Sequence, residues 1–187
     1  MKRVVVIALV ALSLPMAAWA TSFVDYANTL GTLTVSNMGV TISSPLTAIA
    51  PRGGPITTGN LGTVSIATGA LTGGNLGGVG SVIFGTGSIT IKDASQAVLF
   101  SGTFTSAALK LVSVGADGDH QYQFFAVIGD GSTTQTTFNT GKAFLEAGTY
   151  DLASGNTIAV IPEPGTLGLL GTGLLGIAGL VRRKLTS

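Results

Sequence analysis

The fold class of this chain is decided by one stretch in its second half: LKLVSV (109–114), then GADGD (115–119), then QYQFFAVI (121–128). Both flanking runs are short and apolar, and they are rich in β-branched or aromatic residues, which favour strands. Residues 115–119 between them carry two glycines and two aspartates, as turns commonly do. This pattern predicts a β-hairpin, and Gly129-Asp130-Gly131-Ser132 closes its second strand.

The same alternation extends outward from the hairpin. Residues 88–92 (SITIK) alternate between apolar and polar, and residues 98–104 follow after the polar segment 92–96. Weaker candidates for strands are 32–35, 64–67, 81–84, 142–146 and 157–161. Many short strands separated by turn residues predict an all-β body, arranged as an antiparallel β-sandwich.

Residues 51–90 differ from the rest of the body. Twelve of these 40 residues are glycine, and no charged residue occurs from 53 to 91. Glycine-rich runs such as TGGNLGG (72–78) resemble flexible linker. We expect a long loop here, with stacked short strands, as in a solenoid, as the alternative, because no fixed repeat period is present.

The first 20 residues have the three parts of a secretory signal peptide. Lys2 and Arg3 form a positive start, and residues 4–14 are an uncharged apolar run too short to span a bilayer. Pro15 then interrupts the helix, and Ala18 and Ala20 supply the small residues that signal peptidase recognises. We therefore expect export and cleavage after Ala20.

A second apolar segment lies near the C-terminus. Residues 165–181 contain no charge and are rich in leucine and glycine. As a helix they would reach about 25 Å, just short of the ~30 Å hydrocarbon core. Arg182, Arg183 and Lys184 follow at once and orient the predicted transmembrane helix with its end in the cytoplasm.

Directly before this segment stand Pro162, Glu163 and Pro164. Two prolines cannot continue a helix, so the glutamate is displayed on extended backbone that a protease can recognise. The order Pro-Glu-Pro, short apolar helix and basic tail resembles the PEP-CTERM sorting signal of Gram-negative bacteria. That resemblance covers residues 161–187. It implies exosortase as the processing partner and an exported substrate, typically from a bacterium that makes exopolysaccharide.

Charge and domain organisation agree with this division. We expect a signal peptide at 1–20, one body domain at 21–161, and the sorting signal at 162–187. The body carries four basic and seven acidic side chains, a net charge of −3, and has no basic patch that would bind nucleic acid.

The candidate catalytic and metal-binding residues are few. The chain has one histidine, His120, and no cysteine, which removes most metal-site and triad arrangements. Asp117, Asp119 and Asp130 sit beside glycines in acidic loops, where Ca²⁺ binding is the alternative to a turn role. We expect turn residues here, and no catalytic site, metal or cofactor.

Three functions remain open. The first is a structural protein of the cell surface or extracellular matrix, associated with exopolysaccharide in a biofilm. The second is a carbohydrate-binding module, for which Tyr26, Tyr122 and Tyr150 are the aromatic candidates, since Trp19 would be lost with the signal peptide. The third is a secreted hydrolase with paired carboxylates. We rank them in that order.

Overall fold

The structure is a computed structural model that describes residues 22–78 and 80–161. Alternation of apolar with Ser or Thr side chains gives this part of the chain its strands. The strands are β1 (Ser22–Thr29), β2 (Thr32–Ser36), β3 (Gly39–Pro51), β4 (Thr57–Thr68), β5 (Leu71–Gly73), β6 (Val82–Phe84), β7 (Gly87–Asp93), β8 (Val98–Phe104), β9 (Ala107–Val114), β10 (His120–Val127), β11 (Thr133–Thr140) and β12 (Gly148–Ile161).

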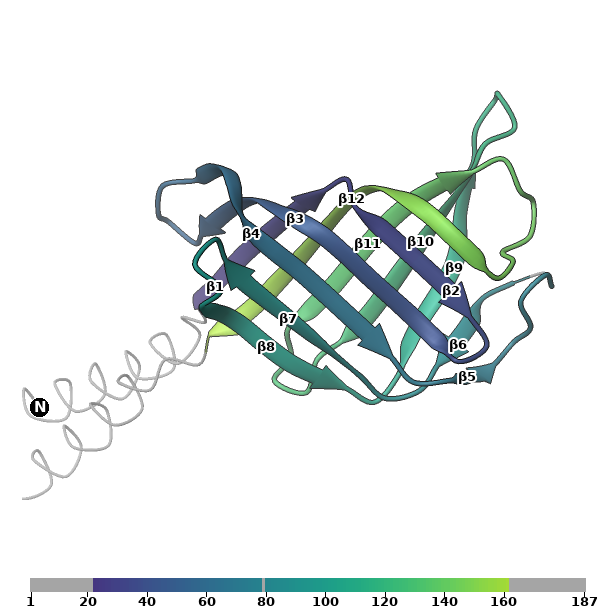
Figure 1. Ribbon diagram of the computed structural model, residues 1–187, viewed down its shortest axis with the longest axis horizontal. Helices are drawn as coiled ribbons and strands as arrows, with labels where there is room; N and C mark the ends of the chain where they lie inside the picture. The colour runs from purple at the N-terminus through teal and green to yellow at the C-terminus, as the bar shows by residue number, and fades with distance from the viewer. Residues whose placement is uncertain (1–21, 79, 162–187) are drawn as a thin grey trace, which may run out of the picture. The chain divides into compact units, whose positions relative to one another are not determined.

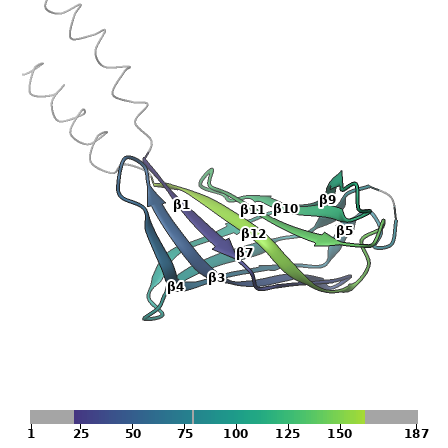
Figure 2. The same cartoon turned by 90° about the horizontal axis from the view of Figure 1, so that it is seen from above.

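These strands form one sheet in the order β5-β6-β9-β10-β11-β12-β1-β3-β4-β7-β8, and β2 pairs with both β12 and β3. The strand pairs are antiparallel, and consecutive strands are often neighbours. Figures 1 and 2 show that the sheet folds over, so that β3, β4 and β7 lie opposite β10, β11 and β12. The predicted all-β antiparallel body is confirmed, with one continuous sheet supplying both layers.

The core lies between the two halves of the sheet. The ring of Phe104 on β8 meets that of Phe124 on β10 edge-on, with centroids 6.4 Å apart. Both side chains are buried, as are the inward residues of nearly every strand. Alternation is what places them there, because successive side chains on a strand point to opposite faces. The largest fully buried apolar side chains are those of Phe84, Phe124, Phe138, Leu33, Leu46, Ile89, Ile91 and Leu109.

β1 and β2 behave as one long strand with a kink at Leu30-Gly31. Both pair with β3: β1 pairs with residues 46–51 of that strand, and β2 pairs with residues 39–43. Leu30 has φ 64° and Gly31 has φ 100°, a left-handed conformation that glycine adopts without strain. Neither β1 nor β2 pairs with Pro45, which lies between these two registers. This gap lets a proline sit within a long central strand.

The prediction of a loop over residues 51–90 is wrong. β4, β5 and β6 lie within this range and β7 begins in it, and β4 alone runs for 12 residues between β3 and β7. Val64 and Ile66 alternate into the core, and their neighbours are exposed Ser and Thr. The strand candidates at 64–67 and 81–84 correspond to parts of β4 and β6, and the glycines around them obscured the rest. Several of them mark kinks and close strand contacts, as at Gly62, where φ is 146°.

The predicted strand at 142–146 is also wrong, because these residues form bends. Leu145 is buried, and Lys142 forms an ion pair with Glu146 on the surface. The Tyr122 hydroxyl donates to the carbonyl oxygens of Lys142 (3.3 Å) and Ala143 (3.0 Å). The segment thus caps the core without joining the sheet.

The predicted processing segments lie outside the described residues. They are the signal peptide (1–20) with Ala18 and Ala20, the motif Pro162-Glu163-Pro164, the span 165–181, and the tail Arg182-Arg183-Lys184. Across residues 22–78 and 80–161, no helix is long and apolar enough to cross a membrane.

Candidate functional site

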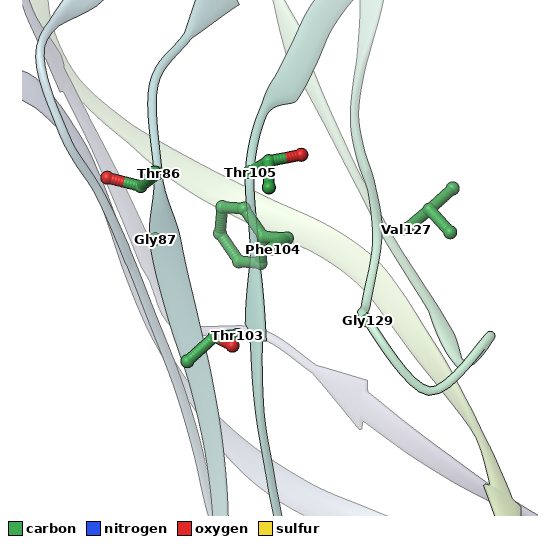
Figure 3. A pocket seen from close by; sticks show the side chains of 7 residues that line it. All are labelled: Thr86, Gly87, Thr103, Phe104, Thr105, Val127 and Gly129. Carbon is green, nitrogen blue, oxygen red and sulfur yellow. The ribbon is translucent and has the colours of Figure 1, made fainter.

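A neutral hollow opens beside the end of β8. It has a volume of about 480 Å³ and takes its lining from three segments: 86–87, 103–105 and 127–129. Figure 3 shows the strand that carries Phe104 in the centre, with Thr86 and Gly87 on one side and Val127 and Gly129 on the other. No titratable side chain lines this hollow, so it offers hydroxyl and backbone groups but no acid or base.

The acidic loops use their carboxylates to hold their own turns. Asp117 Oδ1 accepts the backbone N–H of Asp119 at 3.2 Å, and Asp130 Oδ1 accepts that of Ser132 at 2.8 Å. Asp93 does the same in the turn after β7, where the hydroxyl of Ser95 lowers the pKa of its carboxyl. Within residues 22–78 and 80–161, no three His, Cys, Asp or Glu residues are grouped as a metal would require.

His120 is the first residue of β10, paired with Thr140 on one side and Val114 on the other. Its Nδ1 is buried and makes no hydrogen bond in the described part of the chain. The Nδ1 of His120 is therefore not paired with Asp117 or Asp119, its acidic neighbours in the sequence.

Tyr26 and Tyr122 lie in the body's interior, and Tyr150 is half-buried against the core. Tyr122 stacks on Phe138 with centroids 5.6 Å apart, and Phe138 in turn contacts Tyr150 at 4.9 Å. Burial raises the pKa of the Tyr122 phenol, with a smaller contribution from nearby Tyr150. Tyr26 is 7% exposed and stacks against Phe100. The buried rings of Tyr26 and Tyr122 cannot serve as a sugar platform, and that of Tyr150 packs on Phe138.

A different surface gathers hydrogen-bonding side chains: the outward face of β9 to β12. The strand registers place its residues in cross-strand rows. One row joins Ser113, Gln121 and Asn139, the next joins Lys110, Gln123, Thr137 and Ser154, and a third joins Ala108, Phe125, Gln135 and Asn156. We call this surface the amide face, after Gln121, Gln123, Gln135, Asn139 and Asn156. It is contiguous because four neighbouring strands in one sheet build it.

Most amides on this face are available to a ligand. Ser113 Oγ donates to Gln121 Oε1 at 3.3 Å, and Thr137 Oγ1 lies 2.9 Å from Ser154 Oγ. The carboxamides of the other four make no hydrogen bond to protein groups across residues 22–78 and 80–161. Lys110 is the one charged side chain in these rows.

Two hollows border the amide face at opposite ends of β10. One, about 420 Å³, includes Ile83, Ala108 and Phe125 from a single cross-strand row, with Thr105 and Ser106 beside them. The other, about 220 Å³, is lined by Ser113, Gly115, Asp117, Asp119, Gln121 and Asn139. Gln123 lies between the two along the strand.

The amide face was missed in the sequence, although part of its signal is visible there. Gln121-x-Gln123 and Gln135-x-Thr137-x-Asn139 repeat polar residues with a period of two. That period places each set on one face of a strand. Only the registers bring the two sets, together with Ser154 and Asn156, onto the same surface.

Comparison with protein families identifies a PEP-CTERM protein-sorting motif at residues 160–184. The first two residues of the motif, 160 and 161, are also the last two of β12. Comparisons with curated proteins and with solved structures found no match. The motif marks the chain as an exported protein that an exosortase sorts through a membrane-anchored intermediate to the cell surface.

Proposed function

We propose that this chain is a structural protein of the cell surface or extracellular matrix, retained there with exopolysaccharide and without enzymatic activity. The observation that carries the proposal is the sorting motif at residues 160–184, which begins in the last two residues of the body's final strand. A sorting signal determines where the protein is located, and the body attached to this one is a single folded sheet.

The chemistry of the body supports a structural role. The carboxylates of Asp93, Asp117 and Asp130 accept hydrogen bonds in their own turns, and the largest hollow described above carries no acid or base. The smallest hollow holds Asp117 and Asp119, but both come from one turn and do not face each other from opposite walls. A hydrolase that cleaves glycosidic bonds needs two carboxylates facing each other across a groove. The ranking of structural protein above hydrolase therefore stands as our proposal.

The body's surface suits a hydrated polymer matrix. Its exposed strand faces carry Ser, Thr, Asn and Gln, which exchange hydrogen bonds with water and with hydroxyl groups alike. In this proposal, signal peptidase removes residues 1–20 and exosortase acts at Pro162-Glu163-Pro164. Residues 165–181, followed by Arg182 to Lys184, hold the intermediate in the inner membrane before that cut.

The test is the intact mass of the native protein from membrane, outer-surface and culture fractions, with and without enzymatic removal of exopolysaccharide. We expect a species that begins at Thr21 and ends near Pro162 to Pro164, recovered with the polysaccharide and released when it is digested. A species that keeps residues 165–187 in every fraction, with no change on digestion, would overturn the proposal.

A second candidate is a carbohydrate-binding module, and the amide face is the specific observation that favours it. Polysaccharide binding at one surface is compatible with a matrix role, since a protein retained in a polymer must contact it. The two candidates differ in selectivity: one soluble sugar should compete with a specific module and have little effect on a general matrix component.

A further inference from the structure

We propose that the amide face is a binding site for an extended, uncharged polysaccharide that lies along β10. This inference rests on the proposed function, in which the mature protein is surrounded by polysaccharide. It goes further by naming the surface, the residues and the class of polymer.

The first argument is hydrogen-bonding chemistry. A carboxamide has two N–H donors and a carbonyl acceptor, and a sugar hydroxyl both donates and accepts, so the two groups match in any orientation. Gln123 and Gln135 lie on adjacent strands, and their amides are unused by protein groups in the described part of the chain. Binding a polyol would therefore break no existing hydrogen bond of these two residues.

The second argument is charge. Acidic polymers such as uronates or sulfated glycans are recognised through Arg and Lys, which pair with their anionic groups. The amide face holds only Lys110, and Asp117 and Asp119 lie at its Gln121 end. The body has a net charge of −3, which repels a polyanion at long range. An uncharged polymer meets neither obstacle.

The third argument is shape. From Gln121 to Phe125 the strand advances four residues, about 14 Å at ~3.4 Å each. A hollow lies at each end of this line, one at Phe125 and Ile83 and one at Gln121 and Asn139. A linear polymer of several sugars can follow this path, whereas a small molecule would occupy only one end.

The Phe125 end differs from the Gln121 end in polarity. Ile83 is 42% exposed and Val127 is 52% exposed, and both line the same hollow as Phe125. Sugar rings have apolar C–H faces that pack on such side chains, while their hydroxyls reach the amides of the neighbouring rows. The site thus offers both kinds of contact that an uncharged glycan requires.

The experiment is affinity electrophoresis of the full chain in mild detergent, in gels that contain galactomannan, hydroxyethylcellulose, dextran or sodium alginate. We expect at least one uncharged polymer to retard the protein and alginate to leave it unretarded. The variants are Gln123→Ala and Phe125→Ala. The matched controls are Ser65→Ala on the exposed face of β4 and Leu99→Ala on β8, and circular dichroism verifies the fold of each variant.

The expected effects follow from the contacts removed. Loss of one hydrogen bond in Gln123→Ala weakens binding about fivefold, and loss of the ring in Phe125→Ala weakens it about tenfold. Both controls should stay within about twofold of the wild type, as expected for exposed positions far from the site.

Three results would overturn the inference. The first is retardation by uncharged polymers that neither variant changes, and the second is retardation by alginate alone. The third is that the wild-type protein forms a dimer in the absence of polysaccharide and that Gln123→Ala converts this dimer to a monomer. The amide face would then be a contact between two copies of the chain. The proposed function is tested separately, by the intact-mass measurement on membrane, outer-surface and culture fractions. Recovery of the protein with exopolysaccharide in that measurement does not depend on which surface of the protein binds the polymer.

Discussion

Thr134 on β11 and Thr157 on β12 face each other in the interior of the sheet. Each is 1% exposed, and their Oγ1 atoms lie 2.9 Å apart in a single shared hydrogen bond. Replacing Thr134 with the isosteric Val leaves the Thr157 hydroxyl buried without a partner. An unsatisfied buried polar group costs about 1–3 kcal/mol, so we expect Thr134→Val to lower the free energy of unfolding by about 1–2 kcal/mol.

The double variant should behave differently from the sum of its parts. With Val at both positions no polar group is left unpaired, and the change of both partners is close to neutral. We therefore expect Thr134→Val/Thr157→Val to fall within about 0.5 kcal/mol of the wild type, and the two single variants to add to about 2–4 kcal/mol.

Urea unfolding followed by far-ultraviolet circular dichroism measures all four proteins of this cycle. The matched control is Thr137→Val, since Thr137 bonds Ser154 on the solvent-facing side of the same two strands and can exchange that bond for water. If the single costs simply add in the double variant, the cost comes from packing and the reasoning is refuted. Near-neutral single variants would refute it too, because the lone hydroxyl would then have found another partner.

Further changes test other parts of the body. In Gly62→Ala, a Cβ would overlap the carbonyl oxygen of Lys92 at a φ of 146°, so we expect a loss of about 3 kcal/mol or more, measured by urea unfolding. The Ser95 hydroxyl lowers the pKa of Asp93 in the folded state, so its stabilisation is present at neutral pH and is lost as the pH falls below about 4. In Asp93→Asn the melting temperature should therefore fall less steeply with decreasing pH in this range. An unchanged pH dependence would contradict the role given to Asp93. Burial raises the pKa of Tyr122, so its stabilisation is present below about pH 10 and is lost as the pH rises through the raised value. Tyr122→Phe should lower stability by about 1 kcal/mol at pH 7 and reduce the alkaline loss, as thermal melts from pH 7 to 12 would show.

The strands that could be predicted are those whose alternation is local and apolar. The hairpin of β9 and β10 and the strands β7 and β8 were predicted close to their observed ends, because each carries its own period of two. β11 was missed because its inward residues include Thr134 and Thr136, which are polar yet buried. Hydrophobicity cannot identify an inward face that is built of threonine.

β3 was missed for a different reason. Ser44 and Pro45 interrupt its apolar alternation, and both are explained only by the neighbouring strands. Ser44 is buried because it accepts a hydrogen bond from Asn28 and donates to the Leu30 carbonyl at the kink. Such tertiary contacts leave no trace in a window of adjacent residues.

The functional features follow the same rule: those encoded by adjacent residues could be predicted, and those formed by tertiary contacts could not. The sorting motif could be found in the sequence because it is contiguous and its chemistry is local. The amide face could not, because Gln123 and Asn156 lie 33 positions apart in the chain and share a surface only through two strand registers.

The position of β12 has a mechanical consequence. This strand runs for 14 residues, with β11 on one edge and β1 and β2 on the other, and the chain continues from its end into the sorting segment. Ladder hydrogen bonds lie perpendicular to the strands, so a pull along β12 from its C-terminal end loads the bonds on both edges together, in shear. A pull across the strands would instead break such bonds one at a time. Tension between a polymer held by the body and a tether at this end would therefore fall on the part of the sheet best placed to resist it.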